Sequence, residues 1–138
     1  MEGRMFLNAD VPKAPPRVSI EKNTQTLLIV DDDPQIRRML VRILSGDFDE
    51  VIVAATPAEA ERKLMVYTVT HLISDFNLGR EHPPGTELVV KWRKRYRSIE
   101  RAVLLTGSGL ADIEVPAEVD RYFLKGVDPS EIRKALKS

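Results

Sequence analysis

The sequence contains no cysteine and only two histidines, and these absences exclude several kinds of functional site. Without cysteine the chain has no disulfides and no thiolate zinc sites. His71 and His82 stand apart from each other and make a poor set of metal ligands. A chain of this composition suits a reducing compartment, and we expect the protein in the cytoplasm.

Long apolar runs and an excess of charge are also missing. No apolar stretch approaches the roughly 18 to 20 residues that span a bilayer, and Met5 to Leu7 is too short for a signal-peptide core. Lys plus Arg total 21 and Asp plus Glu total 21, which leaves no overall charge to attract nucleic acid or a membrane surface. We therefore expect no direct binding to nucleic acids or membranes, and only local attraction to a partner.

The length of 138 residues, with 43% hydrophobic residues, predicts one domain. Residues 1–25 mix charges with three prolines and show no period typical of a helix or a strand. We interpret them as a flexible leader or linker, and residues 26–138 as the folded domain. Whether the chain is a whole protein or a piece of a longer one stays open.

From residue 26 onward, short apolar runs alternate with amphipathic segments. Strands are predicted at 27–30, 51–54, 71–74, 102–105 and 121–124. Helices are predicted at 34–45, at 57 to about 66, at about 86–97, and from 129 onward. Three of them begin with capping signals, which are Asp33-Pro34, Thr56-Pro57 with Glu59, and Asp128-Pro129.

This alternation predicts an α/β fold with a doubly wound parallel sheet of five strands. One connection departs from the pattern, because residues 107–118 contain Gly109 and Pro116 and leave room for about two helical turns. A helix expected between the fourth and fifth strands is therefore predicted to be short or absent.

Polar residues follow four of the five predicted strands. Asp31, Asp32 and Asp33 follow the first, and the third, fourth and fifth end in Asp75, Thr106 and Lys125, whereas the second ends in alanine. Ligands of open parallel sheets bind outside the carboxyl ends of the strands. If the strand order is 2-1-3-4-5, the four polar ends are neighbours.

Carboxylates gathered at one edge need a cation. Two such charges a few Å apart repel by about 4 kcal/mol at an effective dielectric constant near 20. Lys125 supplies one positive charge, and oxygen ligands without histidine or cysteine favour Mg²⁺, which also binds phosphate. The sequence therefore predicts a site for a phosphoryl group.

With this arrangement the chain resembles the receiver domain of two-component response regulators, of the chemotaxis-regulator type, over roughly residues 24–137. The resemblance rests on LLIVDDDP, HLISDFNLG, VLLTG and YFLKG, which occur in order on the expected strands. It implies a flavodoxin-like fold with the strand order 2-1-3-4-5. It also implies a phosphorelay signalling switch, rather than an enzyme, that loses its phosphoryl group slowly by hydrolysis.

The resemblance assigns roles to individual residues. Asp75 would be the phospho-acceptor for a histidine kinase or phosphotransfer protein. Asp32, Asp75 and the backbone carbonyl of Asn77 would hold Mg²⁺, and Asp31 would act through a bound water.

Two further roles concern switching. Lys125 would neutralise the phosphoryl oxygens, and Thr106 would move its hydroxyl onto the new phosphoryl group. Tyr122 lies where receiver domains keep an aromatic switch residue, although a static core residue is the alternative. The output partner is unknown, and weak self-association stays open.

The chain departs from the family pattern in three places. Lys125 is followed by Gly126 instead of proline, which predicts that the usual cis peptide is missing. The loop from Phe76 to Gly85 is long and carries Arg80 and Glu81. The third departure is the short or absent fourth helix, which predicts an unusual output surface.

Simpler or competing interpretations accompany these predictions. Asp33 is expected to be a helix cap, and the basic cluster Lys91 to Arg97 a solvated helix face. A non-switching pseudo-receiver is one alternative function. A phosphohydrolase resembling the haloacid dehalogenases, using Asp31 and Asp33, is another.

Overall fold

The computed structural model describes residues 24–108 and 114–137 and contains one parallel sheet. Its strands are β1 (Thr26–Val30), β2 (Glu50–Ala54), β3 (His71–Asp75), β4 (Arg101–Thr106) and β5 (Arg121–Leu124). Their order is β2-β1-β3-β4-β5, and every neighbouring pair is parallel. The predicted strand order is confirmed. Most of the predicted flexible leader, residues 1–23, lies outside the described residues.

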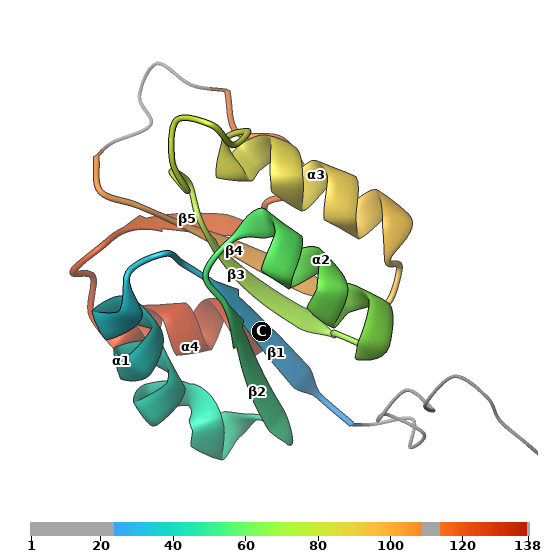
Figure 1. Ribbon diagram of the computed structural model, residues 1–138. Helices are drawn as coiled ribbons and strands as arrows, with labels where there is room; N and C mark the ends of the chain where they lie inside the picture. The colour runs from blue at the N-terminus through green and yellow to red at the C-terminus, as the bar shows by residue number, and fades with distance from the viewer. Residues whose placement is uncertain (1–23, 109–113, 138) are drawn as a thin grey trace, which may run out of the picture.

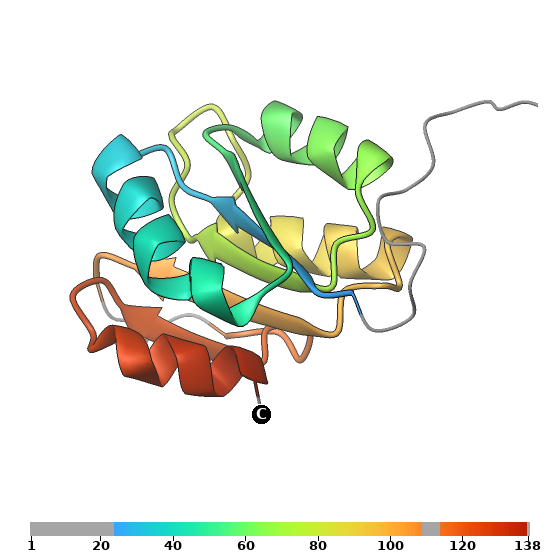
Figure 2. The same ribbon diagram turned by 90° about the horizontal axis from the view of Figure 1, so that it is seen from below.

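Helices cover both faces of the sheet (Figures 1 and 2). They are α1 (Pro34–Leu44), the short 3₁₀ helix η1 (Ser45–Asp47), α2 (Pro57–Val66), α3 (Gly85–Arg95) and α4 (Pro129–Lys137). Helices α1 and α4 pack on one face, and α2 and α3 pack on the other. None of the helices in the described part of the chain has both the length and the apolar character needed to cross a bilayer.

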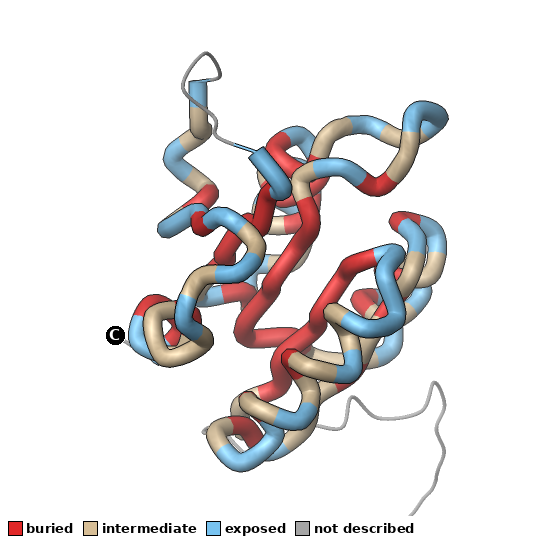
Figure 3. Tube along the Cα trace, turned by 90° about the vertical axis from the view of Figure 1, so that its left-hand side faces the viewer, coloured by how far each residue is buried: buried red, intermediate tan, exposed pale blue. Residues whose placement is uncertain are grey.

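The central strands are buried on both faces, which explains their continuous apolar sequences (Figure 3). Along β1, Leu27 and Ile29 face α1 and α4, whereas Leu28 and Val30 face α2 and α3. Trp92 of α3 is fully buried in the second of these two cores. The flanking helices thus hold β1 and β3 rigidly, and these strands carry the aspartates.

The capping residues act as predicted at α1 and, with one difference, at α2. The carboxylate of Asp33 accepts a hydrogen bond from the Gln35 N–H at 2.9 Å. The hydroxyl of Thr56 accepts one from the Glu59 N–H at 3.1 Å. The Glu59 carboxylate accepts from the N–H of Ala55 rather than that of Thr56, one residue before the usual capping-box partner.

The predicted bounds of α3, about 86–97, were wrong by one residue at the start and two at the end. Its N-cap Pro84 has no side-chain hydrogen bond, and the Gly85 N–H instead donates to the Phe76 carbonyl at 2.7 Å. At the other end Tyr96 takes an extended conformation and packs against the core. Tertiary contacts, rather than local signals, therefore set both ends.

The connection between β4 and β5 contains no helix in its described residues, 107–108 and 114–120. Residues 109–113 lie outside the described part of the chain. On the side of the sheet that carries α3, Tyr122 and Leu124 of β5 are 46% and 53% exposed. The alternative of Tyr122 as a static core residue is therefore wrong, because the described residues leave this face of β5 uncovered.

Arg93 of α3 fixes the end of this connection. Its guanidinium donates to the Glu118 carbonyl and to the Asp120 carboxylate, both at 2.8 Å. The same carboxylate accepts the N–H of Ala102 at 2.8 Å. The expectation that the whole basic cluster is a solvated face was therefore wrong at this position, since Arg93 is a half-buried structural residue.

Candidate functional site

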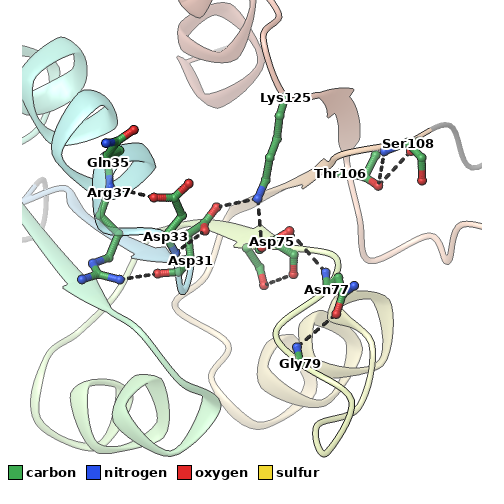
Figure 4. A network of polar contacts seen from close by, with 11 residues as sticks. Asp31, Asp33, Gln35, Arg37, Asp75, Asn77, Gly79, Thr106, Ser108 and Lys125 are labelled. Atoms are coloured by element: carbon green, nitrogen blue, oxygen red, sulfur yellow. Dashed lines mark hydrogen bonds and ion pairs between the residues drawn. The ribbon is translucent and has the colours of Figure 1, made fainter.

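The carboxyl ends of β1, β3 and β5 bring two aspartates and a lysine together (Figure 4). Asp31 follows β1 and Asp75 ends β3, and these two residues are only 1% and 3% exposed. The Lys125 Nζ lies 3.0 Å from Oδ2 of Asp75 and 3.3 Å from Oδ2 of Asp31. The predicted convergence of these side chains at one edge of the sheet is therefore observed.

The backbone around Asp31 fixes its carboxylate. Oδ1 of Asp31 accepts a hydrogen bond from the Asp33 N–H at 2.9 Å, and the Asp31 N–H donates to the Ala54 carbonyl at 3.1 Å. Arg37, one turn into α1, donates to the Asp31 carbonyl at 2.7 Å. The remaining oxygen, Oδ2, therefore points to Lys125.

Asp75 is held by the loop that follows it. Oδ1 of Asp75 accepts the Asn77 N–H at 3.2 Å, and Oδ2 accepts from Lys125. The side-chain oxygen of Asn77 in turn accepts the Gly79 N–H at 3.0 Å. Both Asp75 oxygens thus have a defined direction, and the carboxylate lies at the edge of the sheet rather than inside the core.

Burial and charge oppose each other in this site. Burial raises the pKa of the Asp31 carboxyl, the nearby Asp75 charge adds to this, and the Asp33 N–H and Lys125 counteract part of it. Burial on its own would lower the pKa of Lys125, but its hydrogen bond to Asp75 and the charge of Asp31 raise it overall. The lysine therefore stays charged and compensates only part of the carboxylate repulsion.

The donor set fits a hard divalent cation. Asp31, Asp32 and Asp75 each offer a carboxylate oxygen, and these atoms lie within 4.8 Å of one another. Oδ2 of Asp31 is buried and accepts no hydrogen bond of good geometry from the described residues, although Lys125 is near. Asp32 is exposed. Oxygen-only ligands with open access to water are what Mg²⁺ prefers.

Other predicted site residues lie apart from the carboxylates. The Thr106 hydroxyl donates to the Ser108 carbonyl at 2.8 Å and accepts the Ser108 N–H at 3.3 Å, so it is bonded within its own loop (Figure 4). Tyr122 is exposed on β5. Asp33 is exposed and caps α1, as predicted, which leaves no support for its use as a second catalytic carboxylate.

Sequence reasoning missed Arg37 and Ser108, which fix the Asp31 carbonyl and the Thr106 hydroxyl. The position of Ser108, two residues after Thr106, is a signal for such a local turn bond. Arg37 carried no signal, because its contact depends on the direction in which α1 leaves β1.

The chain is similar to solved structures, although the comparisons of its sequence found no match. No protein-family model matches the chain, and no curated protein sequence matches it. A CheY-like response regulator receiver domain from Methanospirillum hungatei is 28% identical, with a TM-score of 0.72 and coverage of 83% of this chain and 92% of that one. The chemotaxis response regulator CheY4 of Vibrio cholerae is 25% identical, with a TM-score of 0.70 and coverage of 83% and 98%.

A third structure was solved with ligands. The response regulator TrrA from Thermotoga maritima, in complex with Mg²⁺-BeF, is 24% identical and has a TM-score of 0.69. The match covers 83% of this chain and 97% of that one. At this identity the likeness concerns the fold alone.

Proposed function

Since the chain has the structure of a CheY-like response regulator receiver domain, we propose that it is a signalling switch with Asp75 as its phospho-acceptor. The donor is a phosphohistidine of a histidine kinase or phosphotransfer protein. The observation that carries the proposal is the Asp75 carboxylate, fixed at the end of β3 beside Lys125 and within ligand distance of Asp31 and Asp32.

The chemistry asks little of the protein beyond positioning. One Asp75 oxygen forms a bond to phosphorus while the bond between phosphorus and the donor imidazole nitrogen breaks, and that nitrogen keeps the electron pair. The Lys125 ammonium, which already contacts Asp75, neutralises charge on the phosphoryl oxygens. The fixed directions of both side chains reduce the entropy lost in reaching the transition state.

The residues that would hold Mg²⁺ are Asp32, Asp75 and the backbone carbonyl of Asn77, with Asp31 acting through a water. When bound, the ion adds positive charge where the phosphoryl oxygens gather. The closeness of the three carboxylates and the solved structure of TrrA with Mg²⁺-BeF support this part of the proposal.

Switching requires Thr106 to exchange its bonds. Its hydroxyl is now engaged by Ser108, and it would leave that residue to bind the new phosphoryl group. The exposed Tyr122 would then change its position. This is a local charge event that biases a loop with two arrangements.

The proposal also includes the setting of the switch. The receiver domain spans residues 26–138, the protein acts in the cytoplasm, and its output partner is another protein or domain. Hydrolysis returns it slowly to the unphosphorylated state.

The test is incubation with acetyl phosphate and Mg²⁺, followed by intact mass measurement. The wild type should gain one phosphoryl group, and Asp75→Ala and Asp75→Asn should gain none. Asp33→Asn is the matched control, because asparagine caps a helix as well as aspartate, and it should gain one group as the wild type does.

Two outcomes would replace the proposal. No mass gain, together with no binding of beryllofluoride, would identify a non-switching binding module. Steady hydrolysis of a phosphate ester that survives Asp75→Asn but is lost in Asp31→Asn would identify a phosphohydrolase.

A further inference from the structure

Lys125 leaves β5 at the start of a tight turn. The Val127 N–H donates to the Leu124 carbonyl at 3.1 Å, which closes a four-residue turn with Lys125 and Gly126 in the middle. The Lys125 N–H donates to the Thr106 carbonyl at 2.8 Å and continues the ladder between β4 and β5. The backbone of Lys125 is thus held on both sides.

Gly126 occupies a conformation that other residues rarely adopt, with φ +95°. A turn whose third residue has positive φ is of the type that calls for glycine, or less well asparagine, at that place. A Cβ built on Gly126 has no heavy atom within 4 Å. The backbone conformation, and not a lack of space, therefore demands glycine here.

From this turn the Lys125 side chain reaches residues of two other strands. The Lys125 Nζ lies 3.3 Å from Oδ2 of Asp31, at the end of β1, and 3.0 Å from Oδ2 of Asp75, at the end of β3. The described residues contain no cis peptide, as the sequence predicted for this loop.

We propose that Gly126 is a positioning residue for phosphoryl transfer: its left-handed conformation directs the ammonium of Lys125 onto the acceptor carboxylate. The inference rests on the proposed function and deepens it. It means that the turn at Gly126 increases the rate of Asp75 phosphorylation by positioning Lys125, although Gly126 does not touch the reacting atoms.

The test compares phosphorylation rates with acetyl phosphate at saturating Mg²⁺ for the wild type, Gly126→Ala and Gly126→Asn. We expect Gly126→Ala to be slower by about tenfold, because a small misplacement of a catalytic group costs this much or more. Gly126→Asn should recover most of the rate, since asparagine tolerates positive φ. Gly46→Ala is the matched control, because that glycine also has open space but no positive φ, and its rate should equal that of the wild type.

Mg²⁺ affinity, measured by calorimetry, separates a misplaced Lys125 ammonium from a general disruption of the site. Lys125 is not a ligand of the ion, and a displaced ammonium competes less with it for Asp31 and Asp75, so Gly126→Ala should bind Mg²⁺ at least as tightly as the wild type while its rate falls. In a Lys125→Ala background, adding Gly126→Ala should slow the reaction no further, since the lysine through which the glycine acts is gone.

The inference is overturned on its own if the wild type is phosphorylated and Gly126→Ala matches its rate. It is equally overturned if the loss persists in the Lys125→Ala background, or if Mg²⁺ affinity falls in parallel. A wild type that accepts no phosphoryl group overturns the proposed function, and this inference with it.

Discussion

Asp31 is a buried acid whose Oδ2 has an ion partner in Lys125 but no hydrogen bond of good geometry from the described residues. Burial raises its pKa, which means that the charged form is costlier in the folded state than in the unfolded chain. For an acid with a raised pKa, the folded state loses stability as the pH rises from the unfolded value of about 4 through the folded value. The cost therefore grows as the pH rises above the unfolded value.

We predict that Asp31→Asn stabilises the protein in the absence of Mg²⁺, by on the order of 1 kcal/mol, at the expense of the site. The amide keeps an oxygen for the Asp33 N–H and removes the buried charge. Urea unfolding at neutral pH measures the change. Added Mg²⁺ should stabilise the wild type more than the variant, and a variant less stable than the wild type without Mg²⁺ would contradict the prediction.

Single residues also show where sequence reasoning reaches its limit. Asp31, Asp75 and Lys125 were predictable, because the ends of neighbouring parallel strands meet at one edge whatever the details of packing. The exposure of Tyr122 was not, because it depends on what packs over β5. Strand order is a property of the pattern, whereas side-chain direction depends on long-range packing.

At the scale of elements, α3 begins in an unusually close approach to the end of β3. A Cβ on Gly85 would lie 2.3 Å from the Asp75 carbonyl oxygen and 2.9 Å from Cα of Phe76, and both are backbone atoms. The helix can therefore approach the acceptor residue this closely only with glycine at its first position.

We predict that Gly85→Ala destabilises the protein by about 1–3 kcal/mol, because α3 or the end of β3 must move to make room. Gly46→Ala, where nothing lies within 4 Å, should change stability by less than about 0.5 kcal/mol. Chemical denaturation of the two variants gives the comparison. Equal stabilities would show that the approach of α3 to β3 is not tight in solution.

The elements themselves were largely predictable. All five strands were predicted in place, four of them one residue short at one or both ends, and the helix starts at Pro34, Pro57 and Pro129 were correct, since apolar period and capping residues are local signals. The ends of α3 were not predictable. Gly85 is held by a hydrogen bond to the Phe76 carbonyl, and Tyr96 packs against the core, and neither contact is visible in the neighbouring sequence.

At the scale of the whole molecule, His71 joins three parts of the fold at the edge of the sheet opposite the carboxylates. Its Nδ1 lies 2.8 Å from the Thr70 hydroxyl, and its ring packs edge-on against Phe48 at 4.9 Å between centroids. Burial lowers the pKa of His71, Glu100 raises it, and the charges of Lys137 and Arg101 lower it. The backbone of Leu136 in α4 also acts on the His71 ring and raises its pKa.

We predict that this histidine makes the protein less stable in mild acid. Its pKa is lower in the folded state, so below the unfolded value of about 6.5 the unfolded chain binds more protons, and stability falls as the pH falls toward the folded pKa. Urea unfolding between about pH 7 and pH 5 measures this. In His71→Gln the loss over this window should be smaller, and an unchanged slope would assign it to other groups.

Arg93 restrains the chain that leads into β5. Its guanidinium binds the carbonyl of Glu118 and the carboxylate of Asp120, and so holds both to α3. The Asp120 carboxylate also accepts the N–H of Ala102, near the start of β4. The residues that lead into β5 are therefore fastened to α3 and to β4 at once, so the start of β5 is anchored at the end of the strand pair opposite Thr106.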